Sequence, residues 1–251
     1  MASRMGIDCI WMDIEHMPTS VETLSQMIRA TRVGVSDVMA RMAKGEFMLM
    51  GRLLEAGAQG IMYPRCDNAK EAREVVRWAK FAPLGERGFM GANMDQPYGS
   101  MDMGEYVQFA NRETFLVIQV ESPRAVKQSR AIAEVEGVDV VFFGPGDFSV
   151  LCGRPGDFKN PVLRQARARA ARDALAAGKR FGTLVFSVDM AKECLDLGAT
   201  LLCYGMDLMF IKQGLETMQA TFGPLGFHFE NRLKTGDGAY AVEPRPTRKS
   251  A

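Results

Sequence analysis

The sequence predicts an α/β fold, a parallel sheet curled into a (β/α) barrel, and three observations support this. Short apolar runs rich in Val, Ile and Phe alternate with helical segments along most of the chain. The clearest runs lack the apolar–polar alternation of half-exposed strands, which is typical of parallel strands buried on both faces. No G-x-G-x-x-G follows the first strand and no Walker sequence occurs. A doubly wound sheet, the alternative, therefore lacks its usual nucleotide-binding motifs.

The clearest strand–helix–strand unit spans residues 115–149. Its apolar runs, Phe115–Val120 and Val138–Phe143, are joined by a segment long enough for a crossover helix. Glu121 and Asp147 follow these runs, so both carboxylates should reach the carboxyl edge of the sheet, where barrels carry their active sites. Such a pair suits a hard divalent cation such as Mg²⁺ or Mn²⁺. Alternatively, both acids are solvated loop residues or helix N-caps.

Similar patterns place the other elements. Ser20 and Asn68 predict helix starts, whereas Gly57 and Gly178 predict helix ends. We expect seven strands, one fewer than a closed barrel of this type needs, beginning at Asp8, Asp37, Gly60, Phe115, Val138, Arg180 and Thr200. The expected helices cover residues 20–32, 47–56, 68–81, 105–111, 124–134, 161–177, 188–197 and 208–222.

Two stretches interrupt this rhythm. Residues 82–104 are rich in Gly, Met and Pro, and so long an irregular connection usually covers a site or is disordered. Past Phe227 the chain is polar, with Gly, Pro and basic residues. The sequence therefore predicts one barrel domain over residues 1–227 and a disordered polar tail over 228–251. His228, at the start of that tail, has no expected role.

The composition is that of an ordinary soluble globular protein. The 251 residues carry a formal net charge of +1, which indicates neither a nucleic-acid nor a membrane surface, so a small-molecule substrate is expected. The five cysteines show no metal-ligand spacing and predict free thiols in a reducing compartment. The chain has no apolar run of about eighteen residues and no signal-peptide pattern at its start. A cytoplasmic protein is expected.

The residues that follow the predicted strands form a chemically suggestive set. No lysine ends a strand, which weakens a Schiff-base mechanism, and Lys44 is the nearest candidate. A base, a fixed cation and a carboxylate pair at one rim suit metal-assisted chemistry beside a carbonyl. Alternatively, His16 is a core histidine hydrogen-bonded to Asp13, and Arg41 and Arg65 form surface ion pairs. The strand-end residues are Glu15, His16, Arg41, Arg65, Glu121, Asp147, Ser187 and Asp207.

Six motifs in register resemble the HpcH/HpaI aldolase and citrate lyase family. The similarity runs from about Gly6 to Phe222, in order and with few gaps. It is closest to the pyruvate-dependent class II aldolases, such as 4-hydroxy-2-oxoheptanedioate aldolase and the 2-keto-3-deoxy sugar-acid aldolases. The motifs are D-x-E-H-x-P at 13–18, Arg41, LLEAGAQGIMYP at 53–64, PLGERG at 83–88, Q-x-E at 119–121 and GPGDFS at 144–149.

The resemblance implies a barrel of the phosphoenolpyruvate/pyruvate type that cleaves a 4-hydroxy-2-oxo acid to pyruvate and an aldehyde. Cleavage would pass through a metal-stabilised pyruvate enolate. The metal would be Mg²⁺ or Mn²⁺, with Co²⁺ or Zn²⁺ as alternatives, and Glu121 and Asp147 match its ligands. His16 matches the catalytic base, and Asp13 matches the partner that orients the imidazole. A histidine side chain, with an unperturbed pKa of about 6.5, suits proton removal near neutrality.

The remaining site residues are carried over in the same way. Arg41 matches the arginine that binds the carbonyl oxygen of the pyruvate unit, where negative charge grows. Gln119 matches a residue that lines the same pocket. The backbone amides around Gly146 and Asp147 match the cradle for the pyruvate carboxylate. Arg65 is left with a structural role.

One departure from the family concerns the start of the barrel. Family members normally have a further strand and helix ahead of the strand that ends in D-x-E-H. Either Met1 is not the natural start, or the barrel lacks its first strand in this chain. Such a barrel would expose two strand edges. The resemblance also implies that helix 208–222 crosses to a neighbouring barrel, which predicts a homo-oligomer built from dimers, with a hexamer as the family precedent.

Two other functions stay open on the sequence. The first is an acyl-CoA lyase of the citryl- or malyl-CoA type, although no basic, aromatic-lined groove for a nucleotide is evident. The second is an inactive barrel that serves as an assembly module. The intact set of Glu121, Asp147, His16 and Arg41 favours the aldolase.

Overall fold

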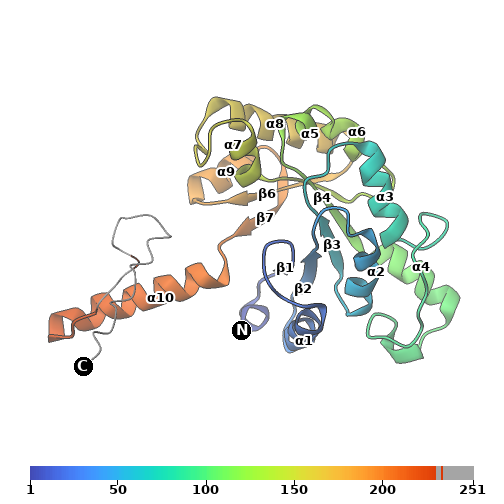
Figure 1. The fold of residues 1–251 in the computed structure, drawn as a ribbon, viewed down its shortest axis with the longest axis horizontal. Helices are drawn as coiled ribbons and strands as arrows, with labels where there is room; N and C mark the ends of the chain where they lie inside the picture. Colours follow the sequence, from blue (N-terminus) through green and yellow to red (C-terminus); the bar gives the residue numbers. More distant parts are fainter. Residues whose placement is uncertain (230–232, 234–251) are drawn as a thin grey trace, which may run out of the picture. The chain divides into compact units, whose positions relative to one another are not determined.

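The computed structural model describes residues 1–229 and 233, and all seven expected strands are present in this part of the chain. The strands form one parallel sheet in which each pairs with the next along the chain (Figure 1). Within the described residues the sheet ends at β1 on one side and β7 on the other. The prediction of an α/β barrel that is one strand short is confirmed. The strands are β1 (Cys9–Asp13), β2 (Asp37–Arg41), β3 (Gly60–Tyr63), β4 (Phe115–Val120), β5 (Val140–Phe143), β6 (Arg180–Val185) and β7 (Ala199–Tyr204).

The connecting helices begin and end largely where capping residues predict. The Ser20 side chain accepts a hydrogen bond from the Thr23 amide, and the Asn68 side chain accepts one from the Glu71 amide. Gly57 has a left-handed φ of 98°, as its predicted place after a helix requires. The α-helices before Tyr204 are α1 (Val21–Thr31), α2 (Phe47–Glu55), α3 (Ala69–Ala79), α4 (Met103–Glu113), α5 (Pro123–Lys127), α6 (Ser129–Ala133), α7 (Pro145–Leu151), α8 (Pro161–Ala176) and α9 (Val188–Asp196). The 3₁₀ turns are Ala2–Met5, Pro97–Gly99 and Gly223–Leu225.

Two helical details differ from the sequence prediction. The single helix expected over residues 124–134 is divided into α5 and α6 at Gln128, whose φ of −101° and ψ of 1° depart from helical values. The short helix α7 was not among the predicted helices, and its N-cap is Gly144 and not Asp147, for which an N-cap role was left open. Pro145 occupies the first position of α7, where a missing amide proton costs nothing. Asp147 therefore lies in the first turn of a helix.

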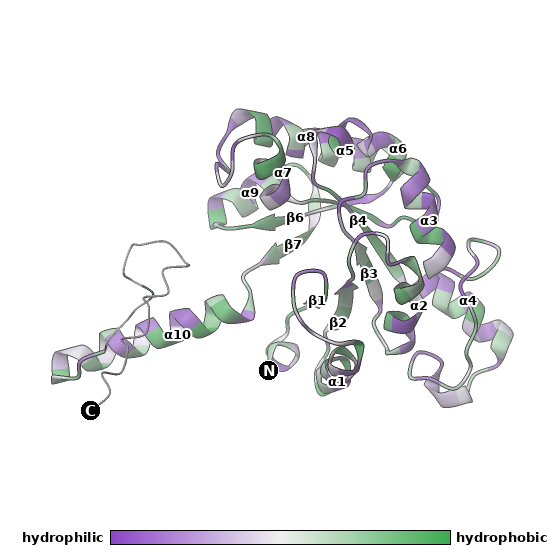
Figure 2. Cartoon of the chain, viewed as in Figure 1, coloured by the Kyte–Doolittle hydropathy of each residue, from purple (hydrophilic) through white to green (hydrophobic). Residues whose placement is uncertain are grey.

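The sheet carries a hydrophobic core on each face, and its strands consist largely of hydrophobic residues (Figure 2). The larger core lies between the sheet and the surrounding helices. The smaller one lies on the inner face and contains Met39, Met62, Val117, Val140 and Phe142, with Trp11 packed against them. Side chains two residues apart on a strand share a face. Asp13, Arg41 and Gln119, each two residues beyond Trp11, Met39 or Val117, therefore continue the inner face at the carboxyl edge of the sheet.

The long connection over residues 82–104 is folded around a buried arginine. The Arg87 side chain is 2% exposed and lies 2.8 Å from the Asp95 carboxylate. The connection also contacts the amino end of β3, since a Cβ added to Gly57 would lie 2.3 Å from the Met94 Cε atom. This contact places part of the segment near the amino ends of the strands, away from the strand-end acids. Whether the segment covers a site or is disordered stays a prediction.

The chain divides into two compact units, Met1–Tyr204 and Gly205–Ala251, and the predicted domain boundary after residue 227 falls inside the second. The second unit contains α10 (Asp207–Phe222), which buries none of its residues. The predicted tail 228–251 lies outside the described residues apart from 228, 229 and 233, so its disorder stays a prediction. All five cysteines are free thiols, as expected. No described helix has the length and hydrophobicity needed to cross a membrane, and the expected cytoplasmic location stays a prediction.

Candidate active site

Three inner-face side chains meet at the carboxyl ends of β1, β2 and β4. Asp13 and Arg41 are register partners on adjacent strands. Arg41 donates from Nε to Asp13 Oδ1 at 2.9 Å and from Nη2 to Asp13 Oδ2 at 2.6 Å. Arg41 Nη1 also lies 3.4 Å from Gln119 Oε1, and its guanidinium carbon lies 4.5 Å from the centre of the Trp11 ring. The arginine predicted to bind substrate is therefore buried and held in one orientation.

The pairing also decides the charge state of Asp13. Burial on its own would raise the pKa of this carboxyl group, but the hydrogen bonds and the charge of Arg41 outweigh burial and lower the pKa below its usual value. Asp13 is thus ionised at neutral pH. It was predicted to orient His16, whereas the structure engages both of its oxygens with Arg41.

The carboxylate beside His16 is that of Glu15. Glu15 Oε2 lies 3.6 Å from His16 Nε2 and 3.3 Å from Arg41 Nε, and Glu15 Oε1 lies 3.6 Å from Arg65 Nε. The Glu15 side chain is 5% exposed, whereas that of His16 is 57% exposed. Burial raises the pKa of Glu15, and the charges of Arg41, His16 and Arg65 counteract that rise. Sequence reasoning placed Glu15 at a strand end but gave it no role.

Arg65 has an unusual backbone for a residue treated as structural. Its φ is 46°, in the left-handed region that non-glycine residues rarely adopt. Lys44 Nζ donates to the Arg65 carbonyl oxygen at 2.6 Å, and the next amide, that of Cys66, donates to the Gln119 carbonyl oxygen at 3.0 Å. These bonds hold the strained residue in place at the rim, beside Glu15.

The two predicted metal ligands lie on neighbouring units of the sheet. Glu121 follows β4 and is 2% exposed, and Asp147 lies in the first turn of α7 after β5. Burial raises the pKa of Glu121 to about 8, the Asp147 and Glu15 carboxylates add to the rise, and Arg41 counteracts it. The two acids are therefore close enough to influence each other. Gly144 makes this approach possible, because a Cβ at that position would lie 2.5 Å from Glu121 Oε1.

The side chains around Glu121 and Asp147 suit a divalent metal. Within the described part of the chain, no group of three or more His, Cys, Asp or Glu side chains is arranged as a metal site, so the protein would supply two ligands and leave the other positions to water and substrate. The cluster holds four acidic side chains and two arginines, so a divalent cation would balance the charge when all four acids are ionised. The acids are Asp13, Glu15, Glu121 and Asp147, and the cations are Arg41 and Arg65.

A polar network joins the connections that follow β2, β3 and β4. Lys44 Nζ lies 2.8 Å from Asp67 Oδ2 and 3.1 Å from Glu71 Oε1, and Asp67 also pairs with Arg124. Tyr63 donates to Glu71 at 2.7 Å. Burial works against the charge of Lys44, but the hydrogen bonds that it donates to Asp67 and Glu71 outweigh burial and raise the pKa of Lys44. A firmly protonated Lys44 is a poor Schiff-base nucleophile, in agreement with the sequence.

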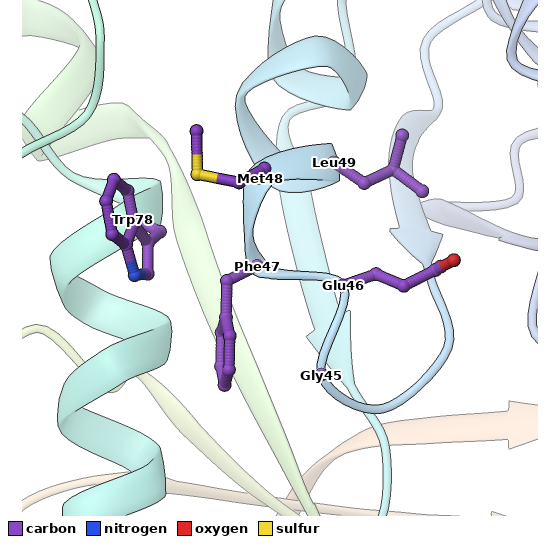
Figure 3. A pocket seen from close by; sticks show the side chains of 6 residues that line it. All are labelled: Gly45, Glu46, Phe47, Met48, Leu49 and Trp78. Carbon is purple, nitrogen blue, oxygen red and sulfur yellow. The ribbon is translucent and has the colours of Figure 1, made fainter.

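A separate hollow of about 420 Å³ lies between the start of α2 and helix α3 (Figure 3). Its lining is mostly apolar, with Trp78 of α3 facing Phe47 and Met48, and Glu46 is its one acidic side chain. None of the predicted site residues lines it. We therefore place the candidate active site at the charged rim and not in this hollow.

A curled parallel sheet with buried acids and a fixed arginine at its carboxyl edge defines a barrel enzyme that works on a small polar ligand. The model of one family, HpcH/HpaI aldolase/citrate lyase, matches residues 1–213 of the chain. The chain belongs to this family, as its motifs predict.

Individual relatives agree with this assignment. A 2-keto-3-deoxy-L-rhamnonate aldolase of Klebsiella pneumoniae is 35% identical over 222 residues, which cover 88% of this chain and 83% of the relative. A hydroxypyruvate/pyruvate aldolase of Delftia acidovorans is 34% identical over 83% of this chain and 77% of its own length. The crystal structure of an HpcH/HpaI aldolase from Desulfitobacterium hafniense DCB-2 is 28% identical, has a TM-score of 0.81 and covers 87% of this chain and 86% of that one.

Proposed function

We propose that this chain is a metal-dependent class II aldolase that cleaves a 4-hydroxy-2-oxo acid to pyruvate and an aldehyde. The observation that carries the proposal is the fixed Arg41 near the buried Glu121 and its neighbour Asp147, in a chain whose relatives are named as aldolases. A guanidinium held in one plane can stabilise the charge that develops on a carbonyl oxygen.

Glu121 and Asp147 would hold the divalent cation, and Mg²⁺ or Mn²⁺ suits two carboxylate ligands with further oxygen ligands from water and substrate. The raised pKa of Glu121 supports this role, because a cation at the same place would offset the repulsion between the two acids. A bound cation supplies polarisation of the substrate ketone.

The chain's own groups would bind and orient the 2-oxo acid. Arg41 uses three of its five N–H groups on Asp13 and Gln119, which leaves two to donate to the ketone oxygen. Gln119 keeps the guanidinium turned towards β4. The backbone amides of Gly146 and Asp147 would cradle the carboxylate, and the space beside Gly146 is open, since a Cβ there would meet no atom within 4 Å.

His16 would accept the proton of the 4-hydroxyl group as the carbon–carbon bond breaks. Its imidazole is more than half exposed, so a proton taken from the substrate can pass on to water. Its place on the connection after β1 puts it next to the Arg41 cluster.

One assay separates this proposal from the acyl-CoA lyase. Pyruvate release is measured on a panel of 4-hydroxy-2-oxo acids without CoA, with and without EDTA. We expect pyruvate from at least one acid, with loss of activity in EDTA and recovery on adding Mg²⁺ or Mn²⁺. Cleavage of citryl- or malyl-CoA alone would favour the lyase, and no turnover of any of these compounds would favour the assembly module.

We also propose a homo-oligomer, and α10 supports it. This helix carries an apolar face of Leu208, Ile211, Leu215 and Met218, and each of these side chains is 40% or more exposed. Exposed apolar surface of this kind usually marks an interface. Light scattering at micromolar concentration should give a mass above that of a 27.7 kDa monomer, and a stable, active monomer would contradict the proposal.

A further inference from the structure

The geometry points to Glu15 as the residue that positions His16. We propose that the Glu15 carboxylate, and not that of Asp13, holds the imidazole at the rim and stabilises it once it has accepted a proton. The inference rests on the proposed aldolase function and adds a residue to which neither the motifs nor the relatives' names give a role.

The first argument is that Asp13 has little capacity left. Both of its oxygens accept from Arg41, and Oδ1 accepts a further hydrogen bond from the Glu15 amide at 2.9 Å. A carboxylate has about four acceptor sites, so Asp13 keeps at most one for a further donor, and the carboxylate that forms an ion pair with His16 is that of Glu15. The bond to the Glu15 amide instead fixes the backbone just ahead of His16.

The second argument is the state of Glu15 itself. Its side chain is 95% buried, and among the residues that the structure describes its Oε1 atom has no hydrogen-bond partner. A buried carboxylate is costly unless cations or donors surround it. The cationic groups beside Glu15 are Arg41, Arg65 and, when protonated, His16. Of these three, only the imidazole gains and loses its charge during the proposed reaction.

The proton balance follows from these positions. During cleavage the 4-hydroxyl O–H bond breaks and an N–H bond forms on His16, so the imidazole becomes a cation. Glu15 stays ionised and stabilises this cation across the 3.6 Å that separates Oε2 from Nε2. The imidazolium then releases the proton to water at the exposed rim. Glu15 itself takes no proton, which makes it a positioning residue.

A double-mutant cycle tests whether Glu15 acts through His16. Glu15→Gln keeps the shape of the side chain and removes its charge, and it should lower kcat roughly 10- to 100-fold in the wild-type background. In a His16→Ala background the same change should alter kcat less than about 2-fold, because coupled residues are not additive. Asp13→Asn is the matched comparison, since its effect passes through Arg41 and should persist in both backgrounds.

The cycle gives a clear result in either direction. Equal losses from Glu15→Gln in the two backgrounds would mean that Glu15 acts independently of His16 and would overturn the proposal. Glu15→Asp should recover part of the lost kcat, since it restores the charge at a greater distance. If kcat stays unchanged and kcat/KM falls only because the KM for the 2-oxo acid rises, Glu15 would act by positioning Arg41 and the proposal would be overturned.

A second measurement does not depend on activity. The chain has two histidines, so its imidazole Cε1–Hε1 spectrum should show two signals, which His16→Ala assigns. Glu15→Gln should shift or broaden the His16 signal and leave that of His228 unchanged, and the exposed Glu113→Gln control should move neither. An unchanged His16 signal would overturn the positioning role. If no 2-oxo acid is cleaved but the His16 signal moves, the proposed function fails and the contact stands.

Discussion

Asp13 and Arg41 face each other across β1 and β2 and share two hydrogen bonds, of 2.9 and 2.6 Å, so that a carboxylate fixes the plane of the guanidinium. A bidentate pair of this kind restricts rotation more than a single contact does. The orientation of the Arg41 guanidinium is thereby fixed before any substrate binds. A charge that is already oriented stabilises developing negative charge without any reorganisation during the reaction.

Asp13→Asn should weaken both stability and substrate binding. An amide can accept one hydrogen bond from Arg41 but cannot replace the second or the charge, so we expect a loss of about 1.5–3 kcal/mol in the free energy of unfolding. The KM for the 2-oxo acid should rise because Arg41 gains freedom. Urea titration and steady-state kinetics check both effects, with Glu113→Gln as an exposed control. An unchanged KM would mean that Glu15 and Gln119 suffice to hold Arg41.

Glu121→Gln should abolish metal binding and cleavage together, because it removes one of two protein ligands while keeping the side-chain volume. Titration calorimetry with Mn²⁺ measures the first and pyruvate release the second. Glu113→Gln should behave as the wild type in both. Full activity of Glu121→Gln in the presence of a chelator would disprove the metal site.

Gly144→Ala should reduce metal affinity although neither proposed ligand is replaced. The added methyl group would overlap the Glu121 carboxylate, whose Oε1, Cγ and Cδ atoms lie 2.5, 2.6 and 2.8 Å from the ideal Cβ position, so Glu121 must move. Gly51→Ala is the control, since a Cβ there meets no atom within 4 Å. Equal Mn²⁺ affinity in both variants would show that Glu121 can relocate freely.

His16→Ala should lower the rate of aldol cleavage by about 10²- to 10⁴-fold, the usual contribution of one general base. Metal affinity should stay at the wild-type value, because the imidazole lies beside Glu15 and is not one of the two proposed ligands. Single-turnover kinetics on a cleavable 2-oxo acid measure the first quantity. An unaltered cleavage rate would leave His16 with a structural role alone.

Asp67→Asn should destabilise the rim in a pH-dependent way. Burial opposes the ionisation of Asp67, but Lys44 and Arg124 outweigh burial and lower its pKa. A lowered pKa stabilises the fold above the unfolded-state value of about 3.9, and this contribution is lost as the pH falls through the folded-state pKa. Near pH 7 the variant should therefore be less stable by about 1 kcal/mol, and the difference should vanish in acid. A constant difference from pH 7 to pH 3 would exclude the ion pairs as its cause.

The sequence predicted the strands better than the contacts between their ends. All seven strands were located because each is a short apolar run with a definite end, and Ser20 and Asn68 cap their helices through local chemistry. The helix α7 was missed because its glycine and proline residues also suit a loop. The pairing of Asp13 with Arg41 was not predicted, because the sequence does not reveal that the register of β1 and β2 places the two residues opposite each other. The role of Asp13 in orienting His16, implied by the family resemblance, stays a prediction.

Each strand of the sheet lies beside the strand that precedes it in the chain, from β1 to β7. During synthesis, a strand that leaves the ribosome therefore finds its partner already present, separated from it by a single crossover. Assembly can add one β–α unit at a time without waiting for a distant part of the chain, which shortens the period in which an apolar strand is exposed to other nascent chains.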